Sequence, residues 1–444
     1  MNYIINLCVL FIVCFSNINA QQTPARYQSN TIAIIGGIAH IGDGTVIENS
    51  IIIFKNGKLT TVSNKTDYYN SVDIQYTSEL KDVTLIEAKG KHIYPGFIAA
   101  NARLGLVEID AVRASVDKDE IGEMIPNIRS LIAYNAESKV VESMRPNGIL
   151  IAQVAPQGGT ISGTSSIVQL DAWNWEDASI KIDDGIHLNW PNTFRRGRIW
   201  LGEDPTLKAN INYNKNIKRI QQFFDDSKTY NLVTPTTKNL SHEAMNGVHN
   251  GSQNLFIHVN DEKGIIDAVA FGDKNKLKNI VLVGAKESYK TLDLLKSKNI
   301  PVLVSTTHRL PGSAQSDYDM PYKLPKILSE AGIVVGIHNG DSGNFQTRNL
   351  PFYAGQVVGQ GLDKEDALKL ITSNTAKILG IGNKLGTLKP GKDATLFISQ
   401  GDALDMRTNI IDKAFISGRE ISLESHQTEL WKRYRDKYQE QKSN

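Results

Sequence analysis

The sequence contains very little cysteine. Its two cysteines, Cys8 and Cys14, both lie in an apolar run over residues 3–15. Small residues ending at Ala20 follow the run, an order typical of a cleavable signal peptide, and the run is shorter than the roughly 20 residues of a membrane-spanning helix. Cleavage would leave a chain without thiols, which excludes disulfides and cysteine nucleophiles. We therefore expect an exported protein, periplasmic or secreted, from which residues 1–20 are removed.

An excess of charge of either sign is also missing. The 49 Lys and Arg residues nearly balance the 47 Asp and Glu residues, which gives a formal net charge of +2. This balance does not create the field that binding to nucleic acid or to an anionic membrane requires. At 444 residues the chain can form one large domain with a smaller one. We expect a small-molecule partner, no nucleic acid, and no membrane once the signal peptide is gone; assembly of identical copies stays open.

Two common catalytic and nucleotide-binding motifs are absent as well. No serine lies between two glycines at the spacing of a nucleophile elbow. Gly386, Gly391 and Lys392 have the spacing of a phosphate-binding loop, but Asp393 stands where Ser or Thr should bind magnesium. Pro390 also removes a backbone donor from that stretch. We interpret it as a turn between strands.

The order of predicted elements indicates a small β unit followed by a barrel. Residues 31–86 hold short β-rich runs separated by turn signals. From residue 93 onward, apolar strands alternate with helical stretches, the pattern of a parallel sheet or barrel. The stretch from Asp171 to Pro205 fits neither pattern. The predicted strands are residues 93–99, 148–154, 255–259, 280–283, 302–305 and 333–337.

The C-terminal part returns to β structure. A predicted helix at residues 367–379 is followed by turns and by strands at residues 394–399 and 413–416. The charged residues 429–441 favour a solvated surface helix.

Several motifs resemble those of the amidohydrolase superfamily. Tyr94-Pro95-Gly96-Phe97-Ile98 is similar to the first barrel strand of that family, and Pro390-Gly391-Lys392-Asp393-Ala394 to a segment after its barrel. Imidazolonepropionases are the most similar members. The resemblance covers almost the whole mature chain and includes Ile300-Pro301-Val302, Gly340-Asp341-Ser342, Thr375-Ala376-Lys377-Ile378-Leu379-Gly380 and Gly386-Thr387-Leu388.

The predicted fold is α/β: a (β/α)8 TIM barrel plus a small β-sandwich built from both chain ends. The alternation of strands and helices supports the barrel, and the resemblance implies the composite sandwich. We expect residues 21–92 and 381–422 to form the two parts of the sandwich and residues 93–380 the barrel. Residues 423–444 would be a charged helical tail.

The resemblance also implies a metal-dependent hydrolase. In that family, side chains at the strand ends bind one or two divalent metals, and an aspartate on strand eight helps to activate a metal-bound water. The water then attacks an amide, a cyclic amide or a related carbon–nitrogen bond. A metal such as zinc lowers the pKa of the water and polarises the carbonyl, so hydrolysis proceeds near neutral pH.

The ligand set that the resemblance implies is incomplete here. The first strand of the family carries two histidines one residue apart, which share a strand face, but Asn101 and Arg103 occupy those positions. Arginine has no acceptor and opposes a cation. His258 matches the strand-five ligand and Asp341 the strand-eight acid, whereas Gly284 stands near the place of the strand-six histidine. His258 and Asp341 alone fall short of the usual three zinc ligands, so a metal-free protein is the alternative.

Other side chains would stand at the same edge of the barrel. His308 follows strand seven and His338 precedes Asp341, so both, together with Asn101, are candidates for substrate binding at the C-terminal ends of the strands. Arg103 would either pair with Asp341, because an unpaired buried arginine is costly, or hold a substrate carboxylate. Arg348 is a second candidate for that contact.

These residues are compatible with three functions. We favour hydrolysis of a non-peptide carbon–nitrogen bond in a small or cyclic amide, with Asp341 as base and His258 as ligand or electrophile. The alternative is a non-catalytic protein that binds an anionic small molecule or partner through Arg103 or Arg348. A third is metal-free acid–base chemistry by Asp341 with one histidine, such as an isomerisation.

Overall fold

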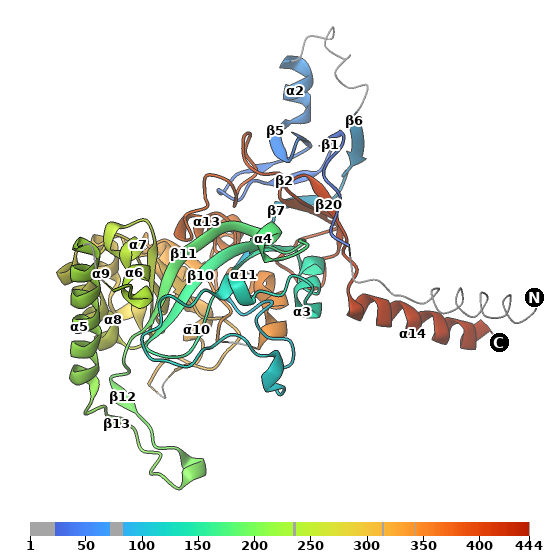
Figure 1. The fold of residues 1–444 in the computed structure, drawn as a ribbon. Coiled ribbons are helices and arrows are strands. Elements are labelled where there is room, and N and C mark those ends of the chain that lie inside the picture. The colour runs from blue at the N-terminus through green and yellow to red at the C-terminus, as the bar shows by residue number, and fades with distance from the viewer. Residues whose placement is uncertain (1–22, 72–82, 234–236, 313–314, 342, 444) are drawn as a thin grey trace, which may run out of the picture.

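The computed structural model describes residues 23–71, 83–233, 237–312, 315–341 and 343–443. A barrel flanked by helices forms the larger part of the molecule, and a pair of sheets packs at one of its ends (Figure 1). The predicted signal peptide at residues 1–20 lies outside the described residues. Within the described ranges, no helix is long and apolar enough to span a bilayer.

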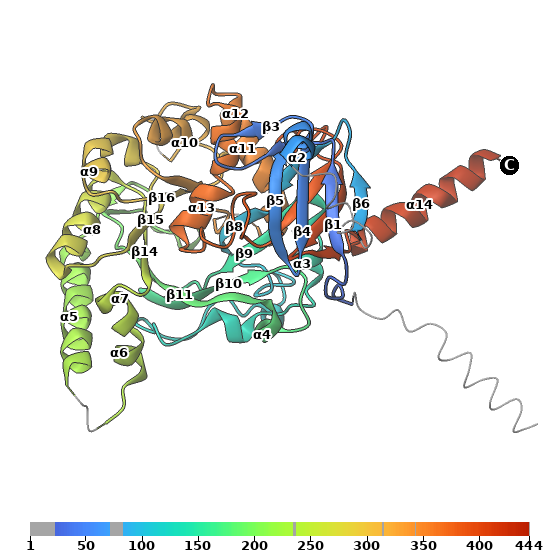
Figure 2. The ribbon, with the colours of Figure 1, turned by 90° about the horizontal axis from the view of Figure 1, so that it is seen from above.

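Eight strands form a nearly closed barrel (Figure 2). A parallel bridge between Ala100 and His338 joins the first strand to the last. The strands read as apolar runs because both of their faces are covered. They are β8 (Phe97–Ala102), β9 (Ile149–Val154), β10 (Ile161–Gln169), β11 (Ser179–Asn189), β14 (Asn254–Val259), β15 (Ile280–Gly284), β16 (Val302–Val304) and β17 (Val335–Ile337).

The first half of the barrel departs from strict β/α alternation. β10 pairs antiparallel with both β9 and β11, whereas the remaining neighbours in the sheet are parallel. Antiparallel strands need no crossover helix, so residues 155–160 suffice to connect β9 to β10. The predicted barrel is confirmed, with β10 reversed.

Helices cover the outside of the second half of the barrel. The predicted helix at residues 367–379 is divided in two, because Thr372 leaves the helical region with φ −130° and ψ −99°. The helices are α5 (Tyr213–Leu232), α6 (Leu240–Ala244), α7 (Asn246–Asn250), α8 (Glu262–Asn275), α9 (Leu292–Ser297), α10 (Met320–Glu330), α11 (Leu350–Val358), α12 (Lys364–Lys369) and α13 (Ser373–Ile378); α3 (Lys139–Glu142) and α4 (Trp175–Ala178) lie in the first half.

Both ends of the chain contribute to two further sheets. Their facing side chains form one apolar core that includes Ile34, Ile52, Phe54, Ile398 and Phe415. The four-stranded sheet has the order β5 (Lys58–Asn64), β4 (Ser50–Lys55), β1 (Thr31–Ile35), β6 (Val83–Glu87), and α2 (Lys65–Ser71) follows β5. The six-stranded sheet has the order β20 (Arg419–Ile421), β19 (Ile411–Ile416), β18 (Leu396–Ser399), β7 (His92–Pro95), β2 (Ile38–His40), β3 (Val46–Ile47).

The strand predicted at residues 93–99 is two strands in different sheets. β7 pairs with β2 and β18 in the six-stranded sheet, and β8 opens the barrel. Gly96 joins them at a crowded point, where an added Cβ would lie 2.9 Å from the Thr395 side chain and 3.0 Å from that of Leu150. The barrel therefore begins at Phe97.

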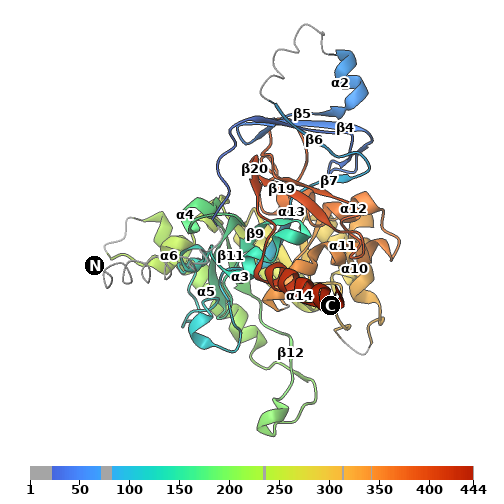
Figure 3. The ribbon, with the colours of Figure 1, turned by 90° about the vertical axis from the view of Figure 1, so that its right-hand side faces the viewer.

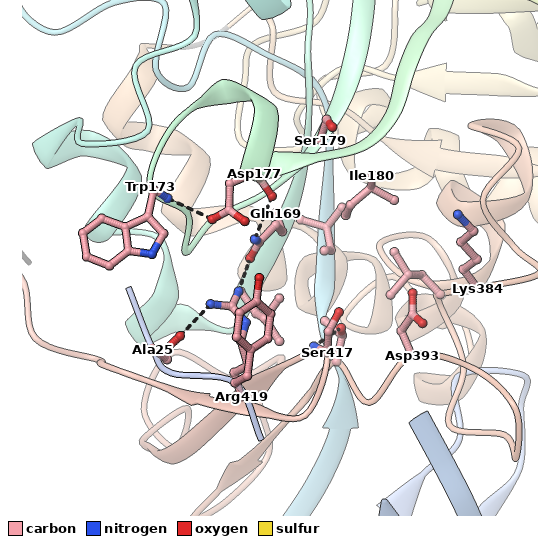
Figure 4. Close-up of a pocket in the computed structure, with 15 residues that line it drawn as sticks. Ala25, Gln169, Trp173, Asp177, Ser179, Ile180, Lys384, Asp393, Ser417 and Arg419 are labelled. Atoms are coloured by element: carbon pink, nitrogen blue, oxygen red, sulfur yellow. Dashed lines mark hydrogen bonds between the residues drawn. The ribbon is translucent and has the colours of Figure 1, made fainter. Parts of the chain in front are cut away.

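A buried ion cluster seals the end of the barrel that faces the sheets. Arg419 donates to Asp171 Oδ2 at 3.1 Å, to Gln169 Oε1 at 2.7 Å and to the Ala25 carbonyl at 3.0 Å. Arg145 lies 3.3 Å from Asp171 Oδ1. A cavity of about 320 Å³ opens beside Arg419 (Figure 4). It lies at the N-terminal ends of β9 and β11, the end of a barrel associated with stability rather than catalysis.

Two segments project from the body of the molecule. An arm of residues 191–212, in the stretch that the sequence left unassigned, contains β12 (Phe194–Arg195) and β13 (Lys208–Ala209). The charged tail forms α14 (His426–Ser443), as predicted (Figure 1).

Candidate active site

Asn101 lies at the end of β8, where the strand is irregular. The register of β8 against β9 shifts between Ala99 and Ala102, and Asn101 has a positive φ of 48°. Asparagine tolerates this left-handed backbone better than most residues. The regular alternation of side chains is therefore interrupted, and the sequence argument that residues 101 and 103 share a face does not hold here. Arg103 lies beyond the end of the strand.

His338 lies just past β17 and is fully buried beside Asn101. Its Nδ1 accepts from the Gly340 backbone N–H at 3.1 Å and lies 3.3 Å from Asn101 Nδ2. A neutral imidazole that accepts at Nδ1 carries its proton on Nε2. The Nε2 atom is buried without a hydrogen-bond partner among the described residues. Burial lowers the pKa of His338, so the ring is neutral near pH 7 and offers an unused donor.

His258 on β14 meets a histidine that the sequence analysis missed. His187 on β11 approaches it with Nδ1 to Nε2 of His258 at 2.9 Å, and stacks on Phe256 with ring centroids 4.8 Å apart. Burial, with the neighbouring His338, lowers the pKa of His258 to about 4. Burial likewise holds the pKa of His187 well below its usual value. Both rings are therefore neutral at pH 7.

Asp341 follows β17 and reaches solvent at the mouth of the barrel. Its Oδ2 accepts a hydrogen bond of 2.7 Å from Ser305. Burial alone would raise the pKa of Asp341, but the electrostatic influence of the nearby His338 ring, the hydrogen bond from Ser305 and the charge of Lys286 together lower it. The carboxylate is therefore ionised at neutral pH and can accept a proton.

Two cations at the mouth also escaped the sequence analysis. Lys286 follows β15 and Arg309 follows β16. Burial lowers the pKa of each, and the charge of Asp341 opposes that effect in both. They line a cavity of about 220 Å³ together with Asn260 and Ser316. Lys286 lies two residues after β15 and Arg309 five residues after β16, and such positions indicate side chains at the mouth of a barrel. The family resemblance, in contrast, directs attention only to a histidine on strand six.

A polar network lies inside the first half of the barrel. Gln153 Oε1 accepts from the Asn101 backbone N–H at 2.9 Å, and Gln153 Nε2 donates to Asp184 Oδ2 at 2.8 Å. Ser165 donates to the other oxygen of Asp184, also at 2.8 Å. Burial nevertheless raises the pKa of Asp184 to about 6. The network therefore holds the backbone of Asn101 in place, while the Asn101 side chain lies beside His338.

The remaining predicted side chains lie apart from this cluster. His308 is exposed, and its ring meets the Tyr353 ring edge-on at 5.0 Å. Arg348 is exposed at the end of a 3-10 turn, and its carbonyl accepts from Asn147 at 2.7 Å. The pairing of Arg103 with Asp341 stays a prediction. The structure brings together His258, His338 and Asp341 and adds His187, Lys286 and Arg309.

Comparison with known proteins shows which sequences and structures this chain resembles. Residues 244–421 match the model of the Amidohydrolase family. An amidohydrolase from Thermotoga maritima MSB8 has the same fold, with a TM-score of 0.75 and 20% identity over 88% of this chain and 99% of its own. Residues 244–421 thus carry the sequence pattern of the Amidohydrolase family, and the resemblance that the motifs indicated is borne out for that part of the chain.

Other solved structures with a similar fold have names that indicate different substrates. Molinate hydrolase matches with a TM-score of 0.54 and 13% identity, over 90% of this chain and 96% of its own. A prolidase complexed with N-methylphosphonate-L-proline matches with a TM-score of 0.52 and 12% identity, over 88% and 99%. At these identities the likeness concerns the fold alone. No curated protein sequence matches the chain.

Amidohydrolases generally use a divalent metal, and the residues at this mouth can be tested for one. His187 and His258 present two facing nitrogens, but each is within hydrogen-bond distance of the other. His338 carries a proton on its remaining nitrogen. Over the described ranges, no three His, Cys, Asp or Glu side chains converge on one point. The donor set therefore does not fit the three protein ligands of a zinc site.

Proposed function

We propose that this protein hydrolyses a carbon–nitrogen bond, other than a peptide bond, in a small or cyclic amide at the mouth of its barrel. The observation that carries the proposal is an ionised carboxylate, Asp341, held by Ser305 beside Lys286 and among neutral histidines. Opposed charges and shifted pKa values at one concave edge are typical of catalytic sites.

The residues at the mouth can supply the proton transfers of hydrolysis. Asp341 takes a proton from a water molecule as the water oxygen attacks the carbonyl carbon. Negative charge then develops on the carbonyl oxygen, where Lys286 and Arg309 stabilise it. When the carbon–nitrogen bond breaks, the proton on Asp341 passes to the leaving nitrogen. The Nε2–H of His338, which has no hydrogen-bond partner among the described residues, is a further donor for the substrate.

A cavity beside the mouth supports a small substrate. Its volume is about 220 Å³, and besides Lys286 and Arg309 it is lined by Asn260 and Met320 and by the acidic Asp261 and Glu287. Known ligand pockets begin near 300 Å³, so a compact amide suits this space better than an extended peptide.

The test compares the wild type with Asp341→Asn on a panel of lactams, cyclic imides and dipeptides. Loss of the base is expected to lower kcat about 10²–10⁴-fold on the amide that is turned over. Asp226→Asn, an exposed aspartate of α5, is the matched control and should keep full activity. Turnover of dipeptides alone, or equal turnover by wild type and Asp341→Asn, would contradict the proposal.

Each assay is run after chelation and again with added zinc, the metal that the family resemblance favours. Elemental mass spectrometry of the protein purified without chelator gives its metal content. Stoichiometric zinc that Asp341→Asn loses would show that Asp341 helps to bind a metal, and would contradict the metal-free chemistry. Activity that survives chelation supports the metal-free chemistry.

A second candidate is binding of an anionic small molecule without catalysis. The observation that favours it is the pair of cations, Lys286 and Arg309, in one cavity, which Asp261 and Glu287 also line. Lys286→Met and Arg309→Met should then each weaken binding of small carboxylates, measured by calorimetry, at least ~10-fold, since a buried charge-assisted contact contributes about 1.5–3 kcal/mol. No turnover together with such binding would favour this candidate.

A further inference from the structure

The arm of residues 191–212 has a shape fixed by its own hydrogen bonds. It leaves the barrel after β11 and extends well beyond the body of the molecule (Figures 1 and 3). At its base the Asn210 N–H donates to the Thr193 carbonyl at 2.9 Å, and near its tip the Gly197 N–H donates to the Asp204 carbonyl at 3.2 Å. The arm is thus an ordered element with defined faces.

The tip of the arm exposes large apolar side chains. Ile199, Trp200 and Leu201 are 70%, 81% and 58% exposed. Three adjacent apolar side chains on an ordered tip form a patch of the kind that marks an interaction surface. Tryptophan in particular is enriched among residues that dominate binding energies.

The arm also carries an excess of positive charge. It has four basic residues and two acidic ones. Glu203 is paired with Arg198, and Asp204 with Lys208. Arg195 and Arg196 are exposed on the stem next to the apolar tip. The partner of this surface should therefore be apolar and acidic.

A surface of that chemistry lies on this same chain. Residues 104–125, the loop after β8, contain six acidic and two basic residues. Ile109, Val112 and Ile121 in this acidic loop are 58%, 45% and 93% exposed. Among the described residues, none of its six acids forms an ion pair with a basic side chain.

We propose that the arm docks on the acidic loop of a second copy of this chain, and that the second copy returns the same contact. β8 and β11 are parallel, so the acidic loop and the arm leave the barrel at the same end. In a dimer with two-fold symmetry, the arm of each copy would contact the acidic loop of the other, so the same contact forms twice. The high exposure of both surfaces shows that neither covers the other within one chain. The partner's arm would then lie over the mouth that contains Asp341.

Sedimentation velocity of the mature full chain over a concentration series tests this dimer. The wild type should sediment as a dimer, and Trp200→Ser should raise the dimer dissociation constant about 30-fold or more. Trp173→Ser, which changes an exposed tryptophan at the opposite end of the barrel, is the matched control and should leave the constant unchanged.

Charge reversal separates the proposed contact from a general effect on folding. The arm variant Arg195→Glu/Arg196→Glu and the loop variant Asp119→Lys/Glu120→Lys should each be monomeric, because like charges then face each other. The chain with all four substitutions should dimerise again, since the charges are complementary once more. Circular dichroism checks that every variant is folded.

Three results would overturn the proposal. One is a wild type that is monomeric at all concentrations, and another is a dimer that the arm and loop variants leave intact. The third is a monomer that floats with anionic phosphatidylserine vesicles and loses this binding in Trp200→Ser, which would make the arm a lipid contact.

Discussion

The two halves of the barrel differ in both construction and chemistry. From β14 to β17 the strands are parallel and alternate with helices, and this half lies within the segment that matches the amidohydrolase family. From β8 to β11 one strand is reversed, the first strand is irregular at Asn101, and a buried amide–carboxylate network fills the interior. The half that keeps the family's construction also keeps its candidate base, Asp341.

The difference teaches where a barrel can change without losing its fold. In the second half, polar side chains project from strand ends into the mouth. In the first half, the backbone N–H of Asn101 is bound to Gln153, and His187 meets His258 rather than solvent. The polar side chains of the first half thus form hydrogen bonds inside the barrel, whereas the second half carries the charges with which a substrate would interact.

The largest expected effect comes from breaking the interior network of the first half. Gln153→Leu removes the donor to Asp184 and the acceptor of the Asn101 N–H, which leaves a buried carboxylate poorly compensated. We expect a loss of about 3–5 kcal/mol in the free energy of unfolding at pH 7, by urea denaturation. Gln222→Leu on the exposed face of α5 should change it by less than about 0.5 kcal/mol. Equal effects would remove the distinction between interior and surface.

The next effect depends on pH. Asp184 has a pKa raised to about 6, so its protonated form favours the folded state. That stabilisation is complete below the pKa of the unfolded chain, near 4, and is lost as the pH rises through 6. Over this interval the wild type should lose about 3 kcal/mol relative to Asp184→Asn, since one pKa unit corresponds to about 1.4 kcal/mol. Parallel stability curves for the two proteins between pH 4 and 7 would contradict this.

A smaller effect is expected at the seam between the halves. A Cβ on Gly340 would lie 2.4 Å from Asn101 Nδ2 and 2.7 Å from the Asn101 carbonyl oxygen. Gly340→Ala should therefore lower the free energy of unfolding by about 1–3 kcal/mol, because the added methyl group overpacks this site. Gly343→Ala, where the nearest atom would be 3.9 Å away, should be neutral or slightly stabilising. Calorimetry on both variants decides whether the halves are tightly coupled there.

The smallest effect falls in the second half. Ser305→Ala removes the hydrogen bond to Asp341 and should raise the pKa of that carboxyl toward its ordinary value. A lowered carboxyl pKa stabilises the folded state only above the pH at which the carboxyl titrates. The loss of about 1 kcal/mol in the free energy of unfolding should therefore be present at pH 7 and absent in acid. Ser297→Ala on exposed α9 is the control. A constant cost at every pH would show that the bond serves packing alone.

The second half of the barrel and the composite sandwich could be predicted from the sequence. Runs such as Leu255–Val259 and Ile280–Val283 are short, apolar and separated by helical spacing, so their strands were placed within about a residue of β14 and β15. Motifs around Gly96 and Pro390 indicated the family. The division at Gly96 was not visible, because Ile93 to Ala99 reads as one apolar run and only its partners, β18 and β9, assign its two parts to different sheets.

The candidate site could be predicted only where a side chain follows a recognisable strand. His258 and Asp341 met that condition. His187 did not, because β11 lies in the stretch from Asp171 to Pro205 that the sequence pattern left unassigned, and its first half has only two apolar residues, Ile180 and Ile182. Lys286 and Arg309 also follow predicted strands, but the sequence offered no reason to pair them with Asp341, because contacts between different strands are not visible in sequence order.

The sheet shared by both chain ends also sets the order in which the protein can fold. β7 is synthesised before the barrel, but its antiparallel partner β18 follows the entire barrel. During synthesis, β7 must therefore wait with one edge unpaired, and such edges promote association between nascent chains. The sheet cannot be completed before β18 has been synthesised, and the pairing of β7 with β18 then closes a loop that contains the whole barrel. We therefore expect completion of the sheet to be the slow step of folding.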